Sequence, residues 1–217
     1  MTSHIRIASF DIGQTYFAFC VELVDVRQLE LIRNIPQKAR YYRDGTPTKE
    51  FEPVLEELYA MGEIELIDSV DLTDDGWASP TTIMVNMTRV LDRYKDVWQT
   101  CSTFVMEQQV IVKEWRSPLE QKLTQHCFSY FLFHFATFKL PVEFPAFQKT
   151  RVLGAEKALN QHRLRKWTFN TAMRIARQRE DESTLKDIRH PMRQEYVSNA
   201  IIQLQAYKYL VFVDKTL

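Results

Sequence analysis

Two acidic residues stand in or at the end of predicted strands. Asp11 follows the apolar run Ile7–Phe10 and comes just before Gly13, and Glu107 lies in the middle or at the end of the strand predicted within the apolar run Thr103–Val112. An unpaired carboxylate is costly to bury, so Asp11 is expected at the rim of the sheet and Glu107 is expected to have a partner. Two such carboxylates repel at short range unless a cation joins them, and their oxygens suit Mg²⁺ or Mn²⁺. The pair predicts a divalent-metal site, although a turn cap would also explain Asp11 alone.

The elements that would carry these residues follow a definite order along the chain. Apolar periodicity and turn residues predict strands over Ile5–Phe10, Thr15–Val24, Ile64–Asp71, Thr103–Val112 and Pro141–Gly154. The same signals predict helices over Ser79–Trp98, Ser117–Phe138 and Leu164–Arg179, a charged loop over 178–190, and a last helix from Pro191. This order predicts an α/β fold with a mixed five-stranded sheet flanked by helices on both faces. Were the strands of Asp11 and Glu107 neighbours, the two carboxylates would lie side by side.

The chain of 217 residues is predicted to form one domain, with an insertion at about 36–62 whose role the sequence leaves open. Its 28 basic and 28 acidic residues cancel, so net charge predicts no polyanion partner, although local patches can exist. Cys20, Cys101 and Cys127 have no paired spacing and are interpreted as buried thiols. The sequence shows no signal peptide and no membrane span, so an intracellular protein is expected.

Four motifs occur in order along the chain. They are SFDIG (Ser9–Gly13), VMEQQ (Val105–Gln109), FPAFQKTRVLG (Phe144–Gly154) and RQEYVSNAIIQLQAYKYL (Arg193–Leu210). Together they resemble the RuvC-like branch of the RNase H-like superfamily, most closely the Holliday junction resolvases of poxviruses and other large DNA viruses. The resemblance implies an endonuclease that cuts four-way DNA junctions, as a homodimer, by two-metal-ion hydrolysis with Mg²⁺, for which Mn²⁺ can substitute. A viral protein of this kind would act in the host cytoplasm or nucleus.

The resemblance also implies roles for single residues. Asp11 would bridge two ions, Glu107 would bind one, and Lys149 would lie near the scissile phosphate. Lys149 could equally be a solvated lysine at a strand end.

The fourth motif departs from the family, which has two aspartates three residues apart on the last helix. Here Tyr196 and Asn199 take those places. Glu195 lies one helical turn before Asn199 and could supply the missing carboxylate, or could simply favour the helix dipole. Asn199 is either a natural handicap or an engineered Asp→Asn change, and we favour the second interpretation.

Seven basic residues and one tryptophan are the candidates for DNA contact, with an ordinary solvated surface as the alternative. They are Lys113, Trp115, Arg116, Lys149, Arg151, Arg165, Lys166 and Arg174. The aromatic helix Ser117–Phe138 is expected to contribute to a dimer interface, because it has more aromatic surface than one sheet face readily covers.

Three other functions stay open. Asp11-Ile12-Gly13-Gln14-Thr15 also fits the first phosphate motif of actin-like and sugar-kinase-like phosphotransferases, but the chain is short for that class and its five glycines form no second phosphate loop. A non-catalytic protein that binds branched DNA would have Asn199 naturally. A nuclease of the same fold could also act on another branched or RNA-containing substrate.

Overall fold

A computed structural model of the chain describes residues 3–73, 76–108, 118–136 and 139–217. Within these residues one five-stranded sheet has the order β3-β2-β1-β4-β5. The strands are β1 (His4–Ile12), β2 (Tyr16–Asp25), β3 (Glu63–Asp71), β4 (Thr103–Gln108) and β5 (Pro141–Pro145). The first three strands pair antiparallel, whereas β4 runs parallel to β1 and β5 runs parallel to β4. The predicted mixed sheet is confirmed.

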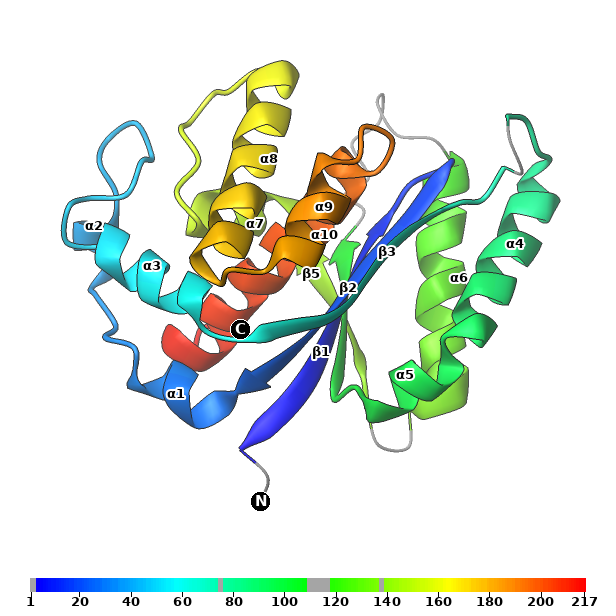
Figure 1. Cartoon of the computed structure of the whole chain (residues 1–217), viewed down its shortest axis with the longest axis horizontal. Helices are drawn as coiled ribbons and strands as arrows, with labels where there is room; N and C mark the ends of the chain where they lie inside the picture. The colour runs from blue at the N-terminus through cyan, green and yellow to red at the C-terminus, as the bar shows by residue number, and fades with distance from the viewer. Residues whose placement is uncertain (1–2, 74–75, 109–117, 137–138) are drawn as a thin grey trace.

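Helices cover both faces of this sheet, as predicted. Figure 1 shows α4, α5 and α6 on one side, and α7 to α10 together with α1 to α3 on the other. The helices are α1 (Val26–Leu31), α2 (Gln37–Arg40), α3 (Glu52–Ala60), α4 (Pro80–Arg93), α5 (Lys95–Thr100), α6 (Pro118–Phe135), α7 (Ala146–Val152), α8 (Gln161–Gln178), α9 (Glu182–Arg189), α10 (Gln194–Lys208) and the π-helical turn η1 (Tyr209–Val213).

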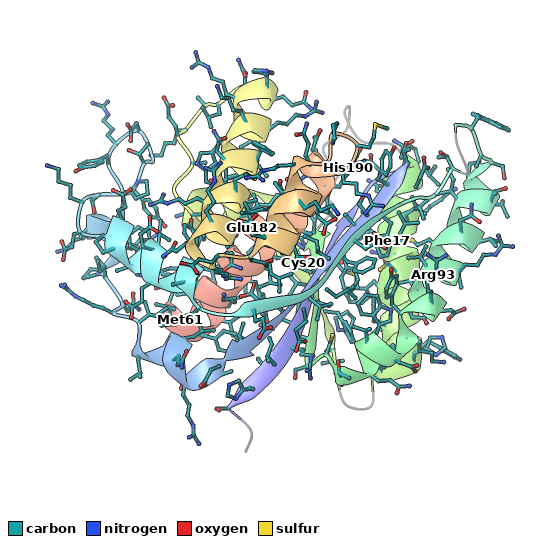
Figure 2. All side chains as sticks on the ribbon, in the orientation of Figure 1. Phe17, Cys20, Met61, Arg93, Glu182 and His190 are labelled. Atoms are coloured by element: carbon teal, nitrogen blue, oxygen red, sulfur yellow. The ribbon has the colours of Figure 1, made fainter. Side chains whose placement is uncertain are left out.

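Strand alternation divides the interior into two cores. Because neighbouring residues of a strand point to opposite faces, Phe10 and Phe17 pack with Trp98 and Phe131 under α4 and α6. Residues of the other parity, such as Cys20, pack against α10; Figure 2 labels Phe17 and Cys20 on opposite sides of the sheet. Asp11 and Glu107 have the parity of the α10 face, so α10 governs their surroundings.

The predicted strand Pro141–Gly154 is wrong beyond its first five residues. Strand β5 ends at Pro145, and α7 begins directly after it. Pro145 caps the helix with extended backbone angles, and alanine, glutamine, lysine and arginine favour the helix that follows. Lys149 therefore lies on a helix and not at a strand end.

The charged segment 178–190 is not the loop that its composition suggested. It contains α9, capped by the Asp181 side chain, which accepts a hydrogen bond from the Thr184 amide at 2.9 Å. Leu185 and Ile188 lie three residues apart and are both buried, which gives the helix its apolar stripe.

Two helix boundaries also differ from the predictions. The predicted Ser79–Trp98 helix is interrupted at Tyr94, where the backbone leaves helical geometry between α4 and α5. The last helix begins at Gln194, because residues 191–193 form a turn.

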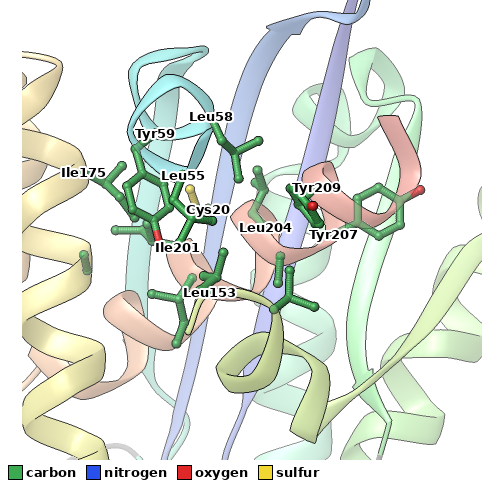
Figure 3. Packing of buried hydrophobic residues seen from close by; sticks show 14 of the residues in the cluster. Cys20, Leu55, Leu58, Tyr59, Leu153, Ile175, Ile201, Leu204, Tyr207 and Tyr209 are labelled. Carbon is green, nitrogen blue, oxygen red and sulfur yellow. The ribbon is translucent and has the colours of Figure 1, made fainter. Parts of the chain in front are cut away.

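The 36–62 segment leaves the sheet between β2 and β3 and folds onto the α10 side. Its helix α3 buries Leu55, Leu58 and Tyr59 in the α10-side core, where Figure 3 shows them near Ile175 and Ile201. The segment is thus packed into the same core as the strands.

Much of the aromatic surface of α6 is used within the chain. Tyr130, Phe131 and Phe135 are buried under the sheet, whereas Phe133 is 86% exposed, and Phe138 lies outside the described residues. The aromatic excess that predicted a dimer interface is therefore smaller than expected. Among the described residues, no helix is both long and apolar enough to cross a membrane.

Candidate metal site and nucleic-acid cleft

The sheet register brings Asp11 and Glu107 together. Strand β1 pairs in parallel with β4 up to Phe10 opposite Met106, and Asp11 and Glu107 are the next residue on each strand. The two carboxylates consequently emerge at the carboxyl ends of neighbouring parallel strands, on the same face. Sites in α/β sheets commonly form at this kind of edge.

Helix α10 is fixed over these two strand ends by Gln203. Its buried side-chain amide donates to the Ser9 hydroxyl at 3.0 Å, to the Phe10 carbonyl at 3.1 Å and to the Val105 carbonyl at 3.1 Å. One side chain thus joins α10 to both strands just before Asp11 and Glu107. This contact sets how closely Asn199, one turn earlier on the helix, approaches the carboxylates.

Two further residues complete the candidate site, which we define as Asp11, Glu107, Lys149 and Asn199. The Lys149 ammonium of α7 donates to Glu107 Oε2 at 2.5 Å, and both side chains are only 12% exposed. The Asn199 amide nitrogen donates to Asp11 Oδ2 at 3.4 Å, a long contact. The cation therefore lies against Glu107, and Asp11 receives a weak neutral donor.

Electrostatics at Asp11 reflect this unequal partnering. Burial raises the pKa of Asp11 to about 7, and the charges of Glu107 and Glu195 act in the same direction. Lys149 and the Asn199 hydrogen bond lower the pKa of Asp11, but they do not offset the loss of water. A carboxyl group in a cleft whose pKa is raised by burial is a candidate for a functional position.

The candidate site opens into a cleft of about 550 Å³. Glu195 lines this cleft but forms an ion pair with Arg165 at 2.8 Å, on the exposed flank of α8 and α10. Tyr196, which takes the place of an expected aspartate, packs against Tyr16 with ring centroids 4.9 Å apart and ring planes tilted by 35°. Neither residue of α10 therefore substitutes directly for the missing carboxylate in this arrangement.

The donor set fits one divalent cation better than two. Asp11 and Glu107 offer carboxylate oxygens, and the Asn199 side chain would add an oxygen once its amide turned over. Within the described ranges, no group of three His, Cys, Asp or Glu side chains is arranged to hold a metal. A bound cation would stabilise the ionised carboxylate of Asp11, whose burial Lys149 and Asn199 do not offset.

Comparisons with solved structures agree with this architecture. The chain superposes on the fowlpox virus resolvase, solved in complex with its substrate Holliday junction DNA, with a TM-score of 0.55 at 12% identity, over 95% of this chain and 99% of that one. For RuvC of Thermus thermophilus the TM-score is 0.54 at 10% identity, over 96% and 98% of the two chains. The fold is that of the RuvC-like resolvases.

Sequence comparisons place relatives in viruses of invertebrates. The uncharacterized protein 170L of Invertebrate iridescent virus 6 is 28% identical, with 97% of this chain and 92% of that protein covered. Protein 97L of Invertebrate iridescent virus 3 is 29% identical, over 78% and 84%. No protein-family model matches the chain.

The predicted DNA contacts are distributed unevenly over the RuvC-like fold. Lys149 and Arg165 line the cleft, and Arg151 lines a neighbouring pocket. Lys166 is exposed on α8, and Arg174 pairs with Glu52 and Glu56 of α3, outside the cleft. The predicted contacts Lys113, Trp115 and Arg116 lie outside the described residues.

Two residues that shape the cleft were not predicted from the sequence. Gln203 positions α10, and its signal is a glutamine within an otherwise apolar helix stretch. Glu120 of α6 lines the cleft and accepts a hydrogen bond from Gln14 at 3.3 Å. No local pattern marks Glu120, because an acidic residue in the first turn of a helix is common for the helix dipole alone.

Proposed function

We propose that the chain is a divalent-metal-dependent endonuclease for four-way DNA junctions, acting as a homodimer. The observation that carries the proposal is the adjacency of Asp11 and Glu107 at the ends of parallel strands, beside Lys149 and in an open cleft. The RuvC-like fold supports the substrate class by analogy. Two copies would match the two-fold symmetry of a junction that is cut twice.

The oxygen donors of the site would hold the cation, and the basic residues would contact the DNA phosphates. Asp11, Glu107 and the turned amide of Asn199 would hold Mg²⁺ or Mn²⁺, which supplies an activated water and stabilises charge on the phosphate. Lys149, released from Glu107 as the cation binds, would face the scissile phosphate and offset its developing charge. Arg165 on the cleft wall would hold the DNA backbone.

Asn199 limits this site. A neutral amide offers one oxygen but lacks the charge that would keep a second divalent ion close to the first and to a phosphate. The unchanged chain would therefore bind one ion well and cut slowly, and the Asn199→Asp form would bind two.

The test is a nicking assay on a synthetic four-way junction with Mg²⁺ or Mn²⁺. We expect the Asn199→Asp form to cut roughly a hundredfold faster than the unchanged chain, a barrier difference of about 2.7 kcal/mol. Mn²⁺ should partly rescue the unchanged chain. Adding Glu107→Gln to Asn199→Asp should abolish cutting while junction binding persists, and linear duplex is the substrate control.

Equal rates for the two forms in Mg²⁺ would refute a metal role for position 199. Binding without any cutting, even by the Asn199→Asp form, would favour a non-catalytic branched-DNA-binding protein, which the neutral side chain of Asn199 also fits. ATP hydrolysis without DNA would favour the phosphotransferase class.

A further inference from the structure

Part of the 36–62 segment packs against the loop after α7 and forms a wall close to the candidate site. Its turn is joined to the loop after α7 by hydrogen bonds from the Lys157 amide to the Asp44 carbonyl at 2.6 Å and from Lys157 Nζ to the Arg43 carbonyl at 3.1 Å. Gly45 has a φ of +95°, and a Cβ there would lie 3.0 Å from the Ala155 carbonyl oxygen. The positive φ and this close contact both disfavour a side chain at Gly45, so the turn packs closely against the loop after α7.

This wall encloses a pocket of about 530 Å³, a size typical of small-molecule sites. Tyr41 lies on the wall and is held by a hydrogen bond from its hydroxyl to the Val152 carbonyl at 2.8 Å. Phe147 of α7, which is 55% exposed, provides a second aromatic ring. Exposed Arg151 and Lys157 line the same pocket. We call these four residues, with Glu156, the base pocket.

The base pocket continues into the cleft of the candidate site. Phe147, Thr150 and Leu164 line both hollows. Helix α7 borders both hollows, since it presents Lys149 to Glu107 and Arg151 to the base pocket. Figure 1 shows α2, α7 and α8 grouped on one side of the sheet.

We propose that the base pocket binds a single nucleobase, unstacked from the DNA strand whose phosphate lies at the candidate site. Aromatic rings suit the flat face of any base, Glu156 can accept from an exocyclic amine, and Arg151 and Lys157 suit the flanking phosphates. A base at a branch point has lost part of its stacking, so its extrusion costs less than in duplex DNA. This inference rests on the proposed function, because it needs branched DNA in the cleft.

The test is a double-mutant cycle between the DNA and the full-length chain. Junctions carry one abasic position at a time near the crossover, and affinity is measured by fluorescence anisotropy in EDTA at fixed salt. For the unchanged chain, we expect one position to weaken binding about fivefold or more. In Phe147→Ala, whose intact fold is checked by thermal unfolding, the same abasic position should weaken junction binding by less than about twofold. The reason is that the variant has already lost the contact with the base.

Tyr42→Ala is the matched control. Tyr42 is a neighbouring aromatic residue, 49% exposed, that does not line the pocket. In Tyr42→Ala the abasic position should therefore weaken junction binding as much as it does for the unchanged chain. The proposal would be overturned if no abasic position weakened binding by the unchanged chain. It would also be overturned if the abasic position weakened binding by Phe147→Ala as much as by the unchanged chain. If nicking by Asn199→Asp is retained in that case, the proposed function stands.

Two further outcomes would also overturn the inference. Junction affinity no tighter than duplex affinity would contradict both the base pocket and the proposed function. Unchanged junction affinity in Phe147→Ala, together with weakened binding of deoxyadenosine monophosphate, would assign the pocket to a free nucleotide.

Discussion

Two groups of charged side chains lie against α10 on the same face of the sheet, and their carboxylates are partnered very differently. The buried charge cluster consists of Glu22, Arg179, Gln205 and Lys208. Glu22 accepts hydrogen bonds from Lys208 at 2.5 Å, from Gln205 at 2.7 Å and from Arg179 at 3.1 Å. Burial alone would raise the pKa of Glu22, but the two cations more than offset it and lower that pKa.

The candidate site has the opposite balance. Burial raises the pKa of Asp11 to about 7, and neither Lys149, whose ammonium contacts Glu107, nor the Asn199 amide offsets it. Both carboxylates stand on strands and face the same helix, so neither strand nor face explains the contrast. The difference is that two cations of the chain contact Glu22, whereas, within the described part of the chain, the lysine of the candidate site contacts Glu107 and leaves Asp11 without a direct cation. A site that leaves this charge to be supplied from outside is suited to bind a cation.

The largest change in the free energy of unfolding is expected in the buried charge cluster, where the carboxylate already has its cations. Replacing Glu22 by glutamine leaves Lys208 and Arg179 buried without their counter-charge, and breaking such a pair costs about 3–5 kcal/mol. We expect Glu22→Gln to lower the free energy of unfolding by that amount in urea titrations.

Glu65→Gln is the matched control on a neighbouring strand. Glu65 pairs with Arg6 through two hydrogen bonds, at 2.5 and 2.9 Å, but the pair is solvent-exposed. Exposed pairs contribute about 0–1 kcal/mol. Similar losses for Glu22→Gln and Glu65→Gln would contradict the contrast between buried and exposed partnering.

At Asp11, in contrast to Glu22, the ionised carboxylate is expected to lower the free energy of unfolding when divalent ions are absent. The folded-state pKa of Asp11 lies above its ordinary value of 3.8, so the folded chain binds more protons between about pH 4 and pH 7. Stability therefore falls as pH rises through this window and stays reduced above it. The full shift corresponds to about 4 kcal/mol, and because Asp11 is partly exposed, solvent screening reduces the expected cost to about 1–2 kcal/mol.

Asp11→Asn should accordingly stabilise the chain by about 1–2 kcal/mol at pH 8 in EDTA, with no difference near pH 3. Thermal or urea unfolding at the two pH values measures this. Mg²⁺ should stabilise the unchanged chain by mass action but not Asp11→Asn. A destabilised variant at pH 8 would show that Asp11 is as well partnered as Glu22.

The same contrast explains what the sequence could predict. Asp11 and Glu107 could be picked out because each is an acid in or after an apolar run, but their adjacency could be predicted only on the condition that their strands are neighbours, and the structure supplies that strand order. Glu22 lies in an equally apolar run, Phe17–Val24, and nothing local separates it from Asp11. Its partner Lys208 is 186 residues away, and only the fold brings them together.

Other misses share this non-local origin. The helical form of α7 depends on Pro145 ending β5, and this moved Lys149 from a strand to a helix. The base pocket joins residues of the 36–62 segment to the loop after α7, more than a hundred positions away. Hydrophobic periodicity gives the elements and their order, whereas contacts between distant segments decide which charged residues are satisfied.

The smallest effect is expected at Glu195, whose role the sequence left between a metal ligand and a helix-dipole residue. Its ion pair with Arg165 is solvent-exposed, with side chains 38% and 55% exposed. Such a pair contributes less than about 1 kcal/mol, so Glu195→Gln should barely change unfolding.

In the Asn199→Asp background, Glu195→Gln should slow junction cutting less than about tenfold, a barrier change under about 1.4 kcal/mol. The reason is that, in the proposed function, Glu195 only orients Arg165, with which it pairs, whereas Asp11 and Glu107 would hold the cation. Arg165→Gln should then cause a loss of similar size, and combining the two changes should add little, because one pair is removed in each case. A loss as complete as that of Glu107→Gln, reversed in part by Mn²⁺, would instead make Glu195 a metal ligand and place a third carboxylate in the candidate site.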